Sequence, residues 1–347
     1  MLYNLRKVLS ILAAALSVLS CGSRPGSYVR ISGIAQSVNY SVKFNTKGVN
    51  VPLEEIKDSV DAILTNIDFS LSGYNKESLL ARFNAGEVIR PDTLFKEMYS
   101  LGYRMWERSG GAVDCAAAPL YDAWGFGFKN SAFPTDSQIS GLLARVGQGK
   151  LPKELPIAED GTLDPRAMGS PRLNYNAIAQ GYTSDVIARY LYSIGVKDML
   201  VDIGEIWCDG LNPSGEPWAV GIDRPVDQVP GSEAAAPKDV WLSGGTPSGI
   251  TTSGNYRKFF IKDGKKYSHT IDPTTGYPVS HSLLSATVVS KVSAAESDAI
   301  ATWCMVVGLE KARRIILEDE NLEGYLVYSN DDGEMVEWMS PGFSIRH

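Results

Sequence analysis

Apolar residues recur at intervals of three and four along much of the first half of the chain. Directly after Pro52 they stand at positions 53, 56, 60, 63, 64 and 67. This spacing places them on one face of a helix, and a proline is common just before a first helical turn. The same periodicity predicts helices at residues 93–107, 136–146 and 181–194, and the first of these should bury Leu94, Met98, Leu101 and Trp106.

Shorter apolar runs, bounded by Gly, Pro or Asp, dominate the second half. They predict strands at residues 199–203, 218–222, 284–290 and 324–328, while residues 294–308 have a helical pattern. Residues 29–44 alternate between apolar and polar types, as a half-buried strand does. In residues 256–270, Asp263-Gly264 separates two aromatic-rich arms, which indicates a β-hairpin, and residues 226–240 resemble an exposed loop. We therefore expect an α+β body with mostly antiparallel sheets packed by helices.

The first 21 residues have the pattern of a processing segment. Arg6 and Lys7 precede an apolar run of twelve residues, from Val8 to Leu19, which is too short for an ordinary membrane span. The run continues into Ser20-Cys21, which resembles a lipoprotein lipobox in which the cysteine is acylated. A plain secretory signal with an incidental cysteine is the alternative.

The domain organisation follows from this segment. We expect a signal peptide at residues 1–20, a tether at 21–29 and one domain at 30–347. Acyl chains on Cys21 would hold the exported protein at the membrane, with the periplasmic side of the inner membrane as the expected location.

Composition and charge narrow the class of function. The net charge is −7 and no Lys/Arg-rich patch occurs, which disfavours a nucleic-acid partner. The three histidines, at positions 269, 281 and 347, are too few and too scattered for a multi-histidine metal site. Cys115, Cys208 and Cys304 form no CxxC pair, so we expect buried thiols rather than disulfides or a zinc site.

Four segments carry residues with binding or catalytic chemistry. Asp298 and Thr302 are four residues apart on a predicted helix, so their oxygens share one face and could begin a magnesium or calcium site; a capping or solvated aspartate is the alternative. Residues 268–278 could hold an acid–base pair or only a capped turn. Residues 174–182 are polar, contain a glycine and lead into a helix, whose free N–H groups suit an anion. Residues 112–128 form an aromatic, Gly-rich loop that could stack on a flat heterocycle or pack in the core.

The order of these segments is more specific than any one of them. The chain contains, in succession, Gly111-Ala-Val-Asp114, Ala177-Ile-Ala-Gln-Gly-Tyr182, Thr252-Ser-Gly-Asn-Tyr256, His269-Thr-Ile-Asp-Pro-Thr-Thr-Gly276 and Asp298-Ala-Ile-Ala-Thr302. This succession resembles the FAD:protein FMN transferases, the ApbE family of exported flavin-transfer lipoproteins. The resemblance covers roughly residues 30–340 and is most specific in residues 252–276.

The resemblance implies a reaction, a cofactor and a set of residues. Members of the family cleave the pyrophosphate of FAD with Mg²⁺, join FMN to a Ser or Thr of a target protein and release AMP. By position, the metal ligands would be the carbonyl of Ala177 and the side chains of Asp298 and Thr302. The residues that would contact FAD are Tyr74, Ala112, Val113, Asp114, Asn174, Gln180 and Ile271. His269 and Asp272 would flank the site as catalytic residues, with His269 as the base.

Three positions depart from the family pattern. The family commonly has Asp where this chain has Asn174, Lys where it has Gln180, and Met where it has Gln36. The first two exchanges cancel in charge, but Gln180 offers only a neutral donor where a lysine would meet phosphate. The implied acceptors are exported flavoproteins, among them subunits of electron-transfer complexes.

Three other functions remain open. The same fold could act as a magnesium-dependent FAD pyrophosphatase that releases FMN and AMP, and Tyr74 is the position at which hydrolytic members can differ. A non-catalytic flavin-binding lipoprotein is the second alternative, but storage needs no metal at the pyrophosphate, so the pair Asp298 and Thr302 argues against it. A structural surface lipoprotein is the third, and the run of motifs argues against that.

Overall fold

The computed structural model describes residues 27–127, 133–223, 225, 239–255, 259–262 and 265–346. The predicted signal peptide and its Cys21 lie outside these residues, as does the Asp263-Gly264 turn. In the part of the chain that is described, no helix combines the length and apolar character needed to cross a membrane.

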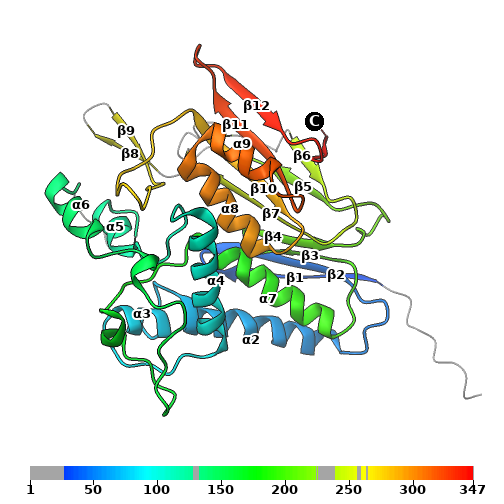
Figure 1. The fold of residues 1–347 in the computed structure, drawn as a ribbon. Coiled ribbons are helices and arrows are strands. Elements are labelled where there is room, and N and C mark those ends of the chain that lie inside the picture. Colours follow the sequence, from blue (N-terminus) through cyan, green and yellow to red (C-terminus); the bar gives the residue numbers. More distant parts are fainter. Residues whose placement is uncertain are drawn as a thin grey trace, which may run out of the picture.

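An eight-stranded antiparallel sheet forms the centre of the molecule (Figure 1). Its spatial order is β1 (Tyr28–Ala35), β2 (Val38–Asn45), β3 (Met199–Asp202), β4 (Ile206–Asp209), β7 (Ser248–Gly254), β10 (Leu283–Ser290), β11 (Leu322–Ser329) and β12 (Met335–Met339). A second antiparallel sheet has the order β13 (Ile345–Arg346), β6 (Asp239–Leu242) and β5 (Ala219–Ile222). The predicted α+β class with mostly antiparallel sheets is confirmed.

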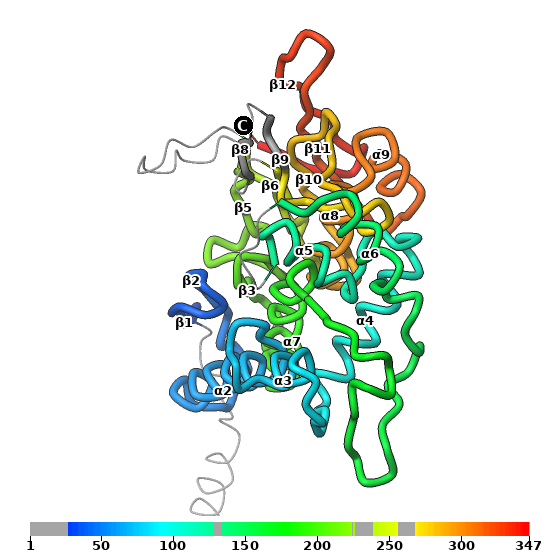
Figure 2. The backbone as a smooth tube through the Cα atoms, turned by 90° about the vertical axis from the view of Figure 1, so that its left-hand side faces the viewer, coloured from blue at the N-terminus to red at the C-terminus, as the bar shows by residue number. Residues whose placement is uncertain are grey.

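Helices cover one face of the main sheet, and the small sheet covers the other. The helices are α2 (Leu53–Leu71), α3 (Leu79–Asn84), α4 (Thr93–Ser109), α5 (Ala118–Ala123), α6 (Asp136–Leu143), α7 (Ala179–Ser193), α8 (Ala294–Val307) and α9 (Leu309–Leu317). Figure 2 shows α8 and α9 on one side of β10 and β11, with β5 and β6 on the opposite side. Along β10, Val288 packs in the helical core and Val289 against the small sheet, as the alternation of a strand requires.

The alternating residues 29–44 form two strands, so the prediction of a single strand is wrong. β1 and β2 pair from Tyr28 opposite Asn45 to Ala35 opposite Val38. Gln36 and Ser37 make the turn between them with φ of 49° and 65°. Positive φ at both central residues matches the twist of a hairpin, but the pair lacks the Asn or Gly that usually marks such a turn. The alternation of apolar and polar residues therefore runs through the turn without a residue that marks it.

The other predicted elements occur with shifted ends. The hairpin of residues 256–270 is confirmed, because β8 (Phe259–Lys262) and β9 (Lys265–Ser268) pair with Lys262 opposite Lys265. The helix predicted at 136–146 ends at Leu143. Of the loop predicted at 226–240, residues 226–238 lie outside the described chain, and residues 239 and 240 belong to β6.

The buried face of α4 is rotated relative to the prediction. Met98 is buried as expected, but Phe95, Tyr99 and Met105 are the other large buried residues, while Leu94, Leu101 and Trp106 are only partly buried. The three cysteines of the described chain are buried free thiols, as expected.

Candidate active site

The first turn of α7 lies directly against α8. The Oδ2 atom of Asp298 accepts a hydrogen bond from the backbone N–H of Gly181 at 3.2 Å, and the residue is only 5% exposed. Gly181 permits this approach because a Cβ there would overlap the carbonyl of Ala294 and lie 2.8 Å from the Cα of Ala295. The predicted metal-binding carboxylate is thereby held at the N-terminus of α7.

The oxygens predicted to bind the metal keep lone pairs for a ligand. Because Gly181 donates to Asp298, its N–H does not return to the carbonyl of Ala177, and no backbone N–H of the described chain donates to that carbonyl. Thr302, one turn beyond Asp298, makes no side-chain hydrogen bond with any described residue. A carboxylate, a carbonyl and a hydroxyl are hard oxygen donors of the kind that Mg²⁺ accepts.

This set contains a single carboxylate. Among the residues that the structure describes, no three His, Cys, Asp or Glu side chains gather into a metal-binding group. Phosphate oxygens and water would therefore supply most ligands of a cation here, which is common for Mg²⁺ bound with a nucleotide.

Burial makes negative charge unfavourable where α7 and α8 are in contact. Burial raises the pKa of Asp298 well above its ordinary value; the N–H of Gly181 opposes this rise and the charge of Asp185 adds to it. Burial also raises the pKa of Asp185 to about 6, against the N–H groups of Ala295 and Ala294, which lower it. A cation next to Asp298 would offset this cost.

The N-terminus of α7 can receive an anion. The N–H groups of Ala179 and Tyr182 donate to carbonyls one turn back, whereas the N–H of Gln180 donates to no acceptor in the described chain. Free N–H groups at a helix N-terminus, with the positive end of the helix dipole, are a common phosphate site. The amide of Gln180 lies over Gly204, 3.1 Å from the position that a Cβ would take. The N–H of Gln180 thus stands next in the chain to that of Gly181, which bonds to Asp298.

Gln36 lies near the same helix end. Its Nε2 donates to the hydroxyl of Thr183 at 2.6 Å, so the turn between β1 and β2 contacts the first turns of α7. The residue predicted on the first strand is therefore a turn residue that braces α7.

A second group of predicted residues lies on the loop after α4. Ala112, Val113 and Asp114 are 6%, 2% and 7% exposed. The Asp114 carboxylate accepts N–H bonds from Ala116 at 2.8 Å and from Gln148 at 3.0 Å. Burial raises the pKa of Asp114, and these N–H groups lower it. The carboxylate thus holds its own loop in shape.

The segment before α7 runs beside that loop. The N–H of Asn174 donates to the carbonyl of Cys115 at 2.8 Å, and its Oδ1 accepts from the N–H of Asn176, also at 2.8 Å. The Nδ2 of Asn176 donates to the hydroxyl of Tyr74 at 3.3 Å, although the Tyr74 side chain is 69% exposed. An exposed ring anchored through its hydroxyl can stack on a flat heterocycle.

The third group lies on the turn after β9. Oδ1 of Asp272 accepts from both the N–H and the hydroxyl of Thr274, at 2.8 and 2.6 Å, so this carboxylate caps its turn. The ring of His269 lies edge-on to Phe126, 6.2 Å between centroids. Ile271 is 3% exposed and packs in a small cluster with Trp124 and Ile139.

Tyr121 of α5 joins the second and third groups. Its hydroxyl donates to the carbonyl of Asp114 at 3.1 Å; burial raises its pKa, and the charges of Asp114, Cys115 and Asp272 add to that rise. Asp298, in contrast, bonds to α7 and not to the turn of His269 and Asp272. The structure therefore brings the predicted metal and phosphate residues together, and connects the predicted catalytic turn to the loop of Asp114.

Sequence reasoning assigned no role to Asp185 or Gln148. An aspartate in mid-helix has no sequence signal that separates a buried cap from a solvated side chain. The Gln148 side-chain amide is buried without a hydrogen-bond partner in the described chain, while the backbone N–H of the same residue donates to the carboxylate of Asp114. A cavity of about 660 Å³ between α4 and α7 touches Asp185 and Ser293 but none of the predicted site residues.

Comparisons with known proteins give a consistent result. Residues 35–326 match the model of the ApbE family. The chain is 32% identical over 346 residues to the FAD:protein FMN transferase of Vibrio cholerae, covering 98% of each chain. It is 33% identical over 306 residues to the FAD:protein FMN transferase of Escherichia coli, covering 83% of this chain and 81% of the relative.

Solved structures agree with these matches. The flavin transferase ApbE from Vibrio cholerae superposes with a TM-score of 0.75 at 28% identity, covering 91% of this chain and 98% of the other. The apo flavinyl transferase ApbE from Pseudomonas stutzeri gives a TM-score of 0.76 at 31% identity, covering 91% and 95%.

Proposed function

Because the chain belongs to the ApbE family of transferase enzymes, we propose that it is a magnesium-dependent FAD:protein FMN transferase. It cleaves the pyrophosphate of FAD and joins FMN through a phosphoester bond to a Ser or Thr of a target protein, with AMP as the leaving product. The acceptors are exported flavoproteins, and subunits of electron-transfer complexes fit this description.

One arrangement supports the proposal above all others. At the N-terminus of α7, the carboxylate of Asp298, the carbonyl of Ala177 and the hydroxyl of Thr302 supply hard oxygens with spare lone pairs. The N–H of Gln180 is available to a phosphate beside them. Oxygens suited to a metal and an N–H suited to a phosphate thus lie at one helix end, an arrangement that suits cleavage of a pyrophosphate bond and is not needed for flavin storage.

Different residues of the proposed site have different roles in the reaction. Mg²⁺ held by Ala177, Asp298 and Thr302 would neutralise charge that develops on the pyrophosphate. The N-terminus of α7 orients the phosphates, and the exposed ring of Tyr74 stacks on a flat ring of FAD. Positioning and charge stabilisation provide most of the catalysis in phosphoryl transfer.

The chemical step exchanges the phosphoanhydride bond of FAD for a phosphoester bond to the acceptor. The acceptor hydroxyl oxygen forms a bond to the FMN phosphorus, and the bond from that phosphorus to the oxygen bridging to AMP breaks. The hydroxyl proton passes to His269, and AMP leaves with the bridging oxygen. Asp272 keeps its turn, and with it His269, in place by capping Thr274.

We expect transfer of FMN, not whole FAD and not AMP, when the purified protein is incubated with FAD, Mg²⁺ and candidate exported flavoproteins. In-gel fluorescence should reveal the labelled acceptor, and intact mass should increase by one FMN in phosphoester linkage. One AMP should appear per FMN transferred, and chelation of divalent cations should stop both. The matched control is the acceptor with its modified Ser or Thr changed to Ala.

Other products would point to the alternatives. Free FMN and AMP as the only products, with several acceptors in excess, would identify a pyrophosphatase. Tight binding of FAD without any cleavage would identify a flavin-binding protein.

We propose in addition that the protein is a lipoprotein anchored through Cys21 on the exported side of the membrane. The support is the charged start, the apolar run and the lipobox-like Val18-Leu19-Ser20-Cys21. An acyl anchor would keep the enzyme at the surface where membrane-bound acceptors lie and so raise their effective concentration.

Replacing Cys21 with Ser should release a soluble protein whose transfer activity on a soluble acceptor is unchanged. Fractionation and incorporation of labelled fatty acid measure the two effects, with Cys115→Ser as the control that leaves lipidation intact. A wild-type protein that is soluble and takes up no label would contradict the anchor.

A further inference from the structure

Helices α7 and α8 each supply a carboxylate that caps the N-terminus of the other. Asp298 of α8 accepts the N–H of Gly181 on α7 at 3.2 Å. In return, Asp185 of α7 accepts the N–H groups of Ala294 and Ala295 at the start of α8, at 2.8 and 2.9 Å, one with each carboxylate oxygen. The carboxylate that faces the proposed metal and the carboxylate that holds its helix are therefore reciprocal partners.

The first turn of α8 has every N–H bonded within the protein. Besides the two bonds to Asp185, the N–H of Glu296 donates to the hydroxyl of Ser293 at 3.0 Å, and the N–H of Ser297 donates to the carbonyl of Ser293 at 3.2 Å. This helix end is saturated, unlike the start of α7, so it acts as an anchor and not as a phosphate site.

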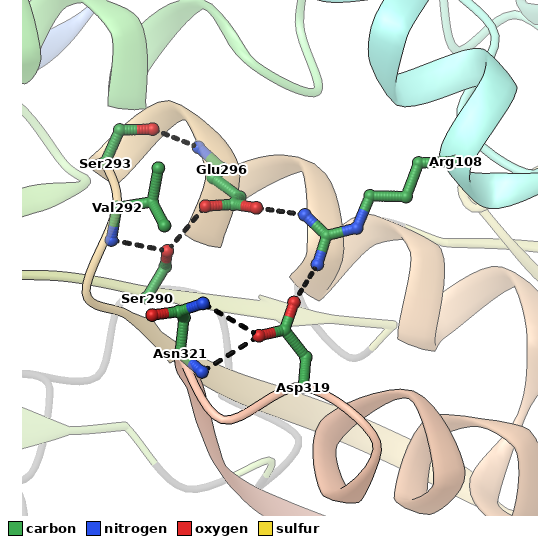
Figure 3. Close-up of polar contacts among 7 residues, drawn as sticks. All are labelled: Arg108, Ser290, Val292, Ser293, Glu296, Asp319 and Asn321. Carbon is green, nitrogen blue, oxygen red and sulfur yellow. Dashed lines mark hydrogen bonds and ion pairs between the residues drawn. The ribbon is translucent and has the colours of Figure 1, made fainter.

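A third helix fixes the same turn from another direction (Figure 3). The carboxylate of Glu296 pairs with Arg108, the penultimate residue of α4, and accepts from the hydroxyl of Ser290 at 2.9 Å. The other end of the Arg108 guanidinium pairs with Asp319, beyond α9, at 2.6 Å. Asp319 in turn accepts the N–H of Asn321 at 2.9 Å.

The ion pairs that Arg108 makes with Glu296 and Asp319 are partly shielded from water. The side chains of Arg108, Glu296 and Asp319 are 32%, 12% and 29% exposed, so these pairs are partly removed from water. A planar guanidinium can bridge two carboxylates at a defined angle, which a lysine ammonium cannot reproduce.

We propose that Asp185 and Arg108 are positioning residues for the metal: together they set the direction of α8 and so the positions of Asp298 and Thr302. The proposal rests on the proposed function, because it concerns that same site. Neither residue touches the substrate; each acts through the first turn of α8.

Helix geometry gives the reason for such a rigid anchor. Thr302 lies eight residues after Ala294, about 12 Å along the helix, so a tilt of about 5° at the first turn moves it by about 1 Å. Mg²⁺ requires near-octahedral geometry with ligands at about 2.1 Å, and a shift of that size exceeds what the site can absorb. Loss of the bonds that Asp185 or Arg108 makes to the first turn of α8 should therefore weaken metal binding more than any other property of the site.

The experiment measures binding of Mn²⁺, as a spectroscopic substitute for Mg²⁺, by electron paramagnetic resonance with and without FAD. It compares wild type with Asp185→Asn and Arg108→Lys. Asn removes one of the two acceptors, and Lys cannot bridge Glu296 and Asp319 together. We expect the dissociation constant for Mn²⁺ and the KM for Mg²⁺ to increase about 10–100-fold, as is typical when a supporting shell is lost. The kcat at saturating Mg²⁺ should change by less than about threefold, because the ligands themselves remain.

Two controls separate positioning from simple loss of stability. Asp92→Asn weakens an equivalent cap, since Asp92 accepts the N–H of Phe95 at the start of α4. Arg166→Lys disturbs a bidentate pair with Asp164 outside α8, in which Nε donates to Oδ1 and Nη2 to Oδ2. Both should leave the Mn²⁺ affinity unchanged, even where they lower the melting temperature.

The outcomes are distinct. Unchanged Mn²⁺ affinity in folded Asp185→Asn and Arg108→Lys, with normal binding in wild type, would overturn the positioning role alone. Equal weakening in the two control variants would overturn it as well. No saturable Mn²⁺ binding by wild type, with or without FAD, would overturn the proposed metal site and this inference with it. If Asp185→Asn does not fold, Arg108→Lys carries the comparison.

Discussion

Replacing Asp298 with alanine is expected to lower magnesium-dependent flavin transfer by about 10²–10³-fold while the protein stays folded. Asp298 supplies the only carboxylate of the proposed metal site, whose other donors are a carbonyl and a hydroxyl. A bound cation contributes several kcal/mol of transition-state stabilisation, and each ~1.4 kcal/mol corresponds to a factor of ten in rate. Steady-state transfer at a series of Mg²⁺ concentrations measures the loss.

The stability of a second variant, Asp298→Asn, gives an independent check. In the absence of divalent cations, a buried carboxylate next to Asp185 is unfavourable, as the raised pKa of Asp298 indicates. Asp298→Asn removes that charge and keeps a side-chain oxygen for the N–H of Gly181. We expect its melting temperature without metal to equal or exceed that of wild type, and the stabilisation of wild type by Mg²⁺ to disappear. Normal activity of Asp298→Ala, with an unchanged response to Mg²⁺, would refute the assignment of Asp298 as a metal ligand.

Replacing Gly181 with alanine is expected to destabilise the protein and abolish most transfer activity. The new Cβ would overlap the carbonyl of Ala294 and lie 2.8 Å from the Cα of Ala295, so backbone would have to move. Overpacking of this kind costs about 1–3 kcal/mol. Separation of α7 from α8 would also break the bond between Gly181 and Asp298. Chemical denaturation and transfer assays measure the two effects.

Gly141→Ala is the matched control for this prediction. Gly141 lies in α6, and a Cβ there would have no neighbour within 4 Å. Alanine in a helix is favoured over glycine by about 0.5–1 kcal/mol, so the control should be neutral or slightly stabilising with full activity. A Gly181→Ala variant as stable and active as Gly141→Ala would show that the close crossing of α7 and α8 is not required.

Local signals predicted the elements that carry the site. The Asp298–Thr302 spacing placed both side chains one turn apart on a helix, and α8 spans both residues. The polar segment before residue 181 indicated a helix end suited to an anion, and Gln180 has its N–H available there.

Some features left no local signal. The Gln36-Ser37 turn uses residues that rarely take positive φ, so the alternation of residues 29–44 indicated one long strand. The buried face of α4 differs from its apolar stripe because Tyr99 packs inward, with its hydroxyl bonded to the carbonyl of Pro152. In both cases a distant contact outweighs the local preference.

The sequence by itself determined the periodic elements, the family resemblance and the hard-oxygen donors at positions 298 and 302, because each depends on residue type and spacing within a few turns. Only the tertiary structure decided which groups meet. The bond between Gly181 and Asp298 spans 117 positions of the sequence, and the bond between Asp185 and Ala294 spans 109. The pair of Arg108 and Asp319 spans 211 positions. These contacts depend on the angle at which α7, α8 and α4 cross on the sheet. That angle is set by the packing of the whole core, including Gly181 and its lack of a side chain, and packing of this kind has no local pattern in the sequence.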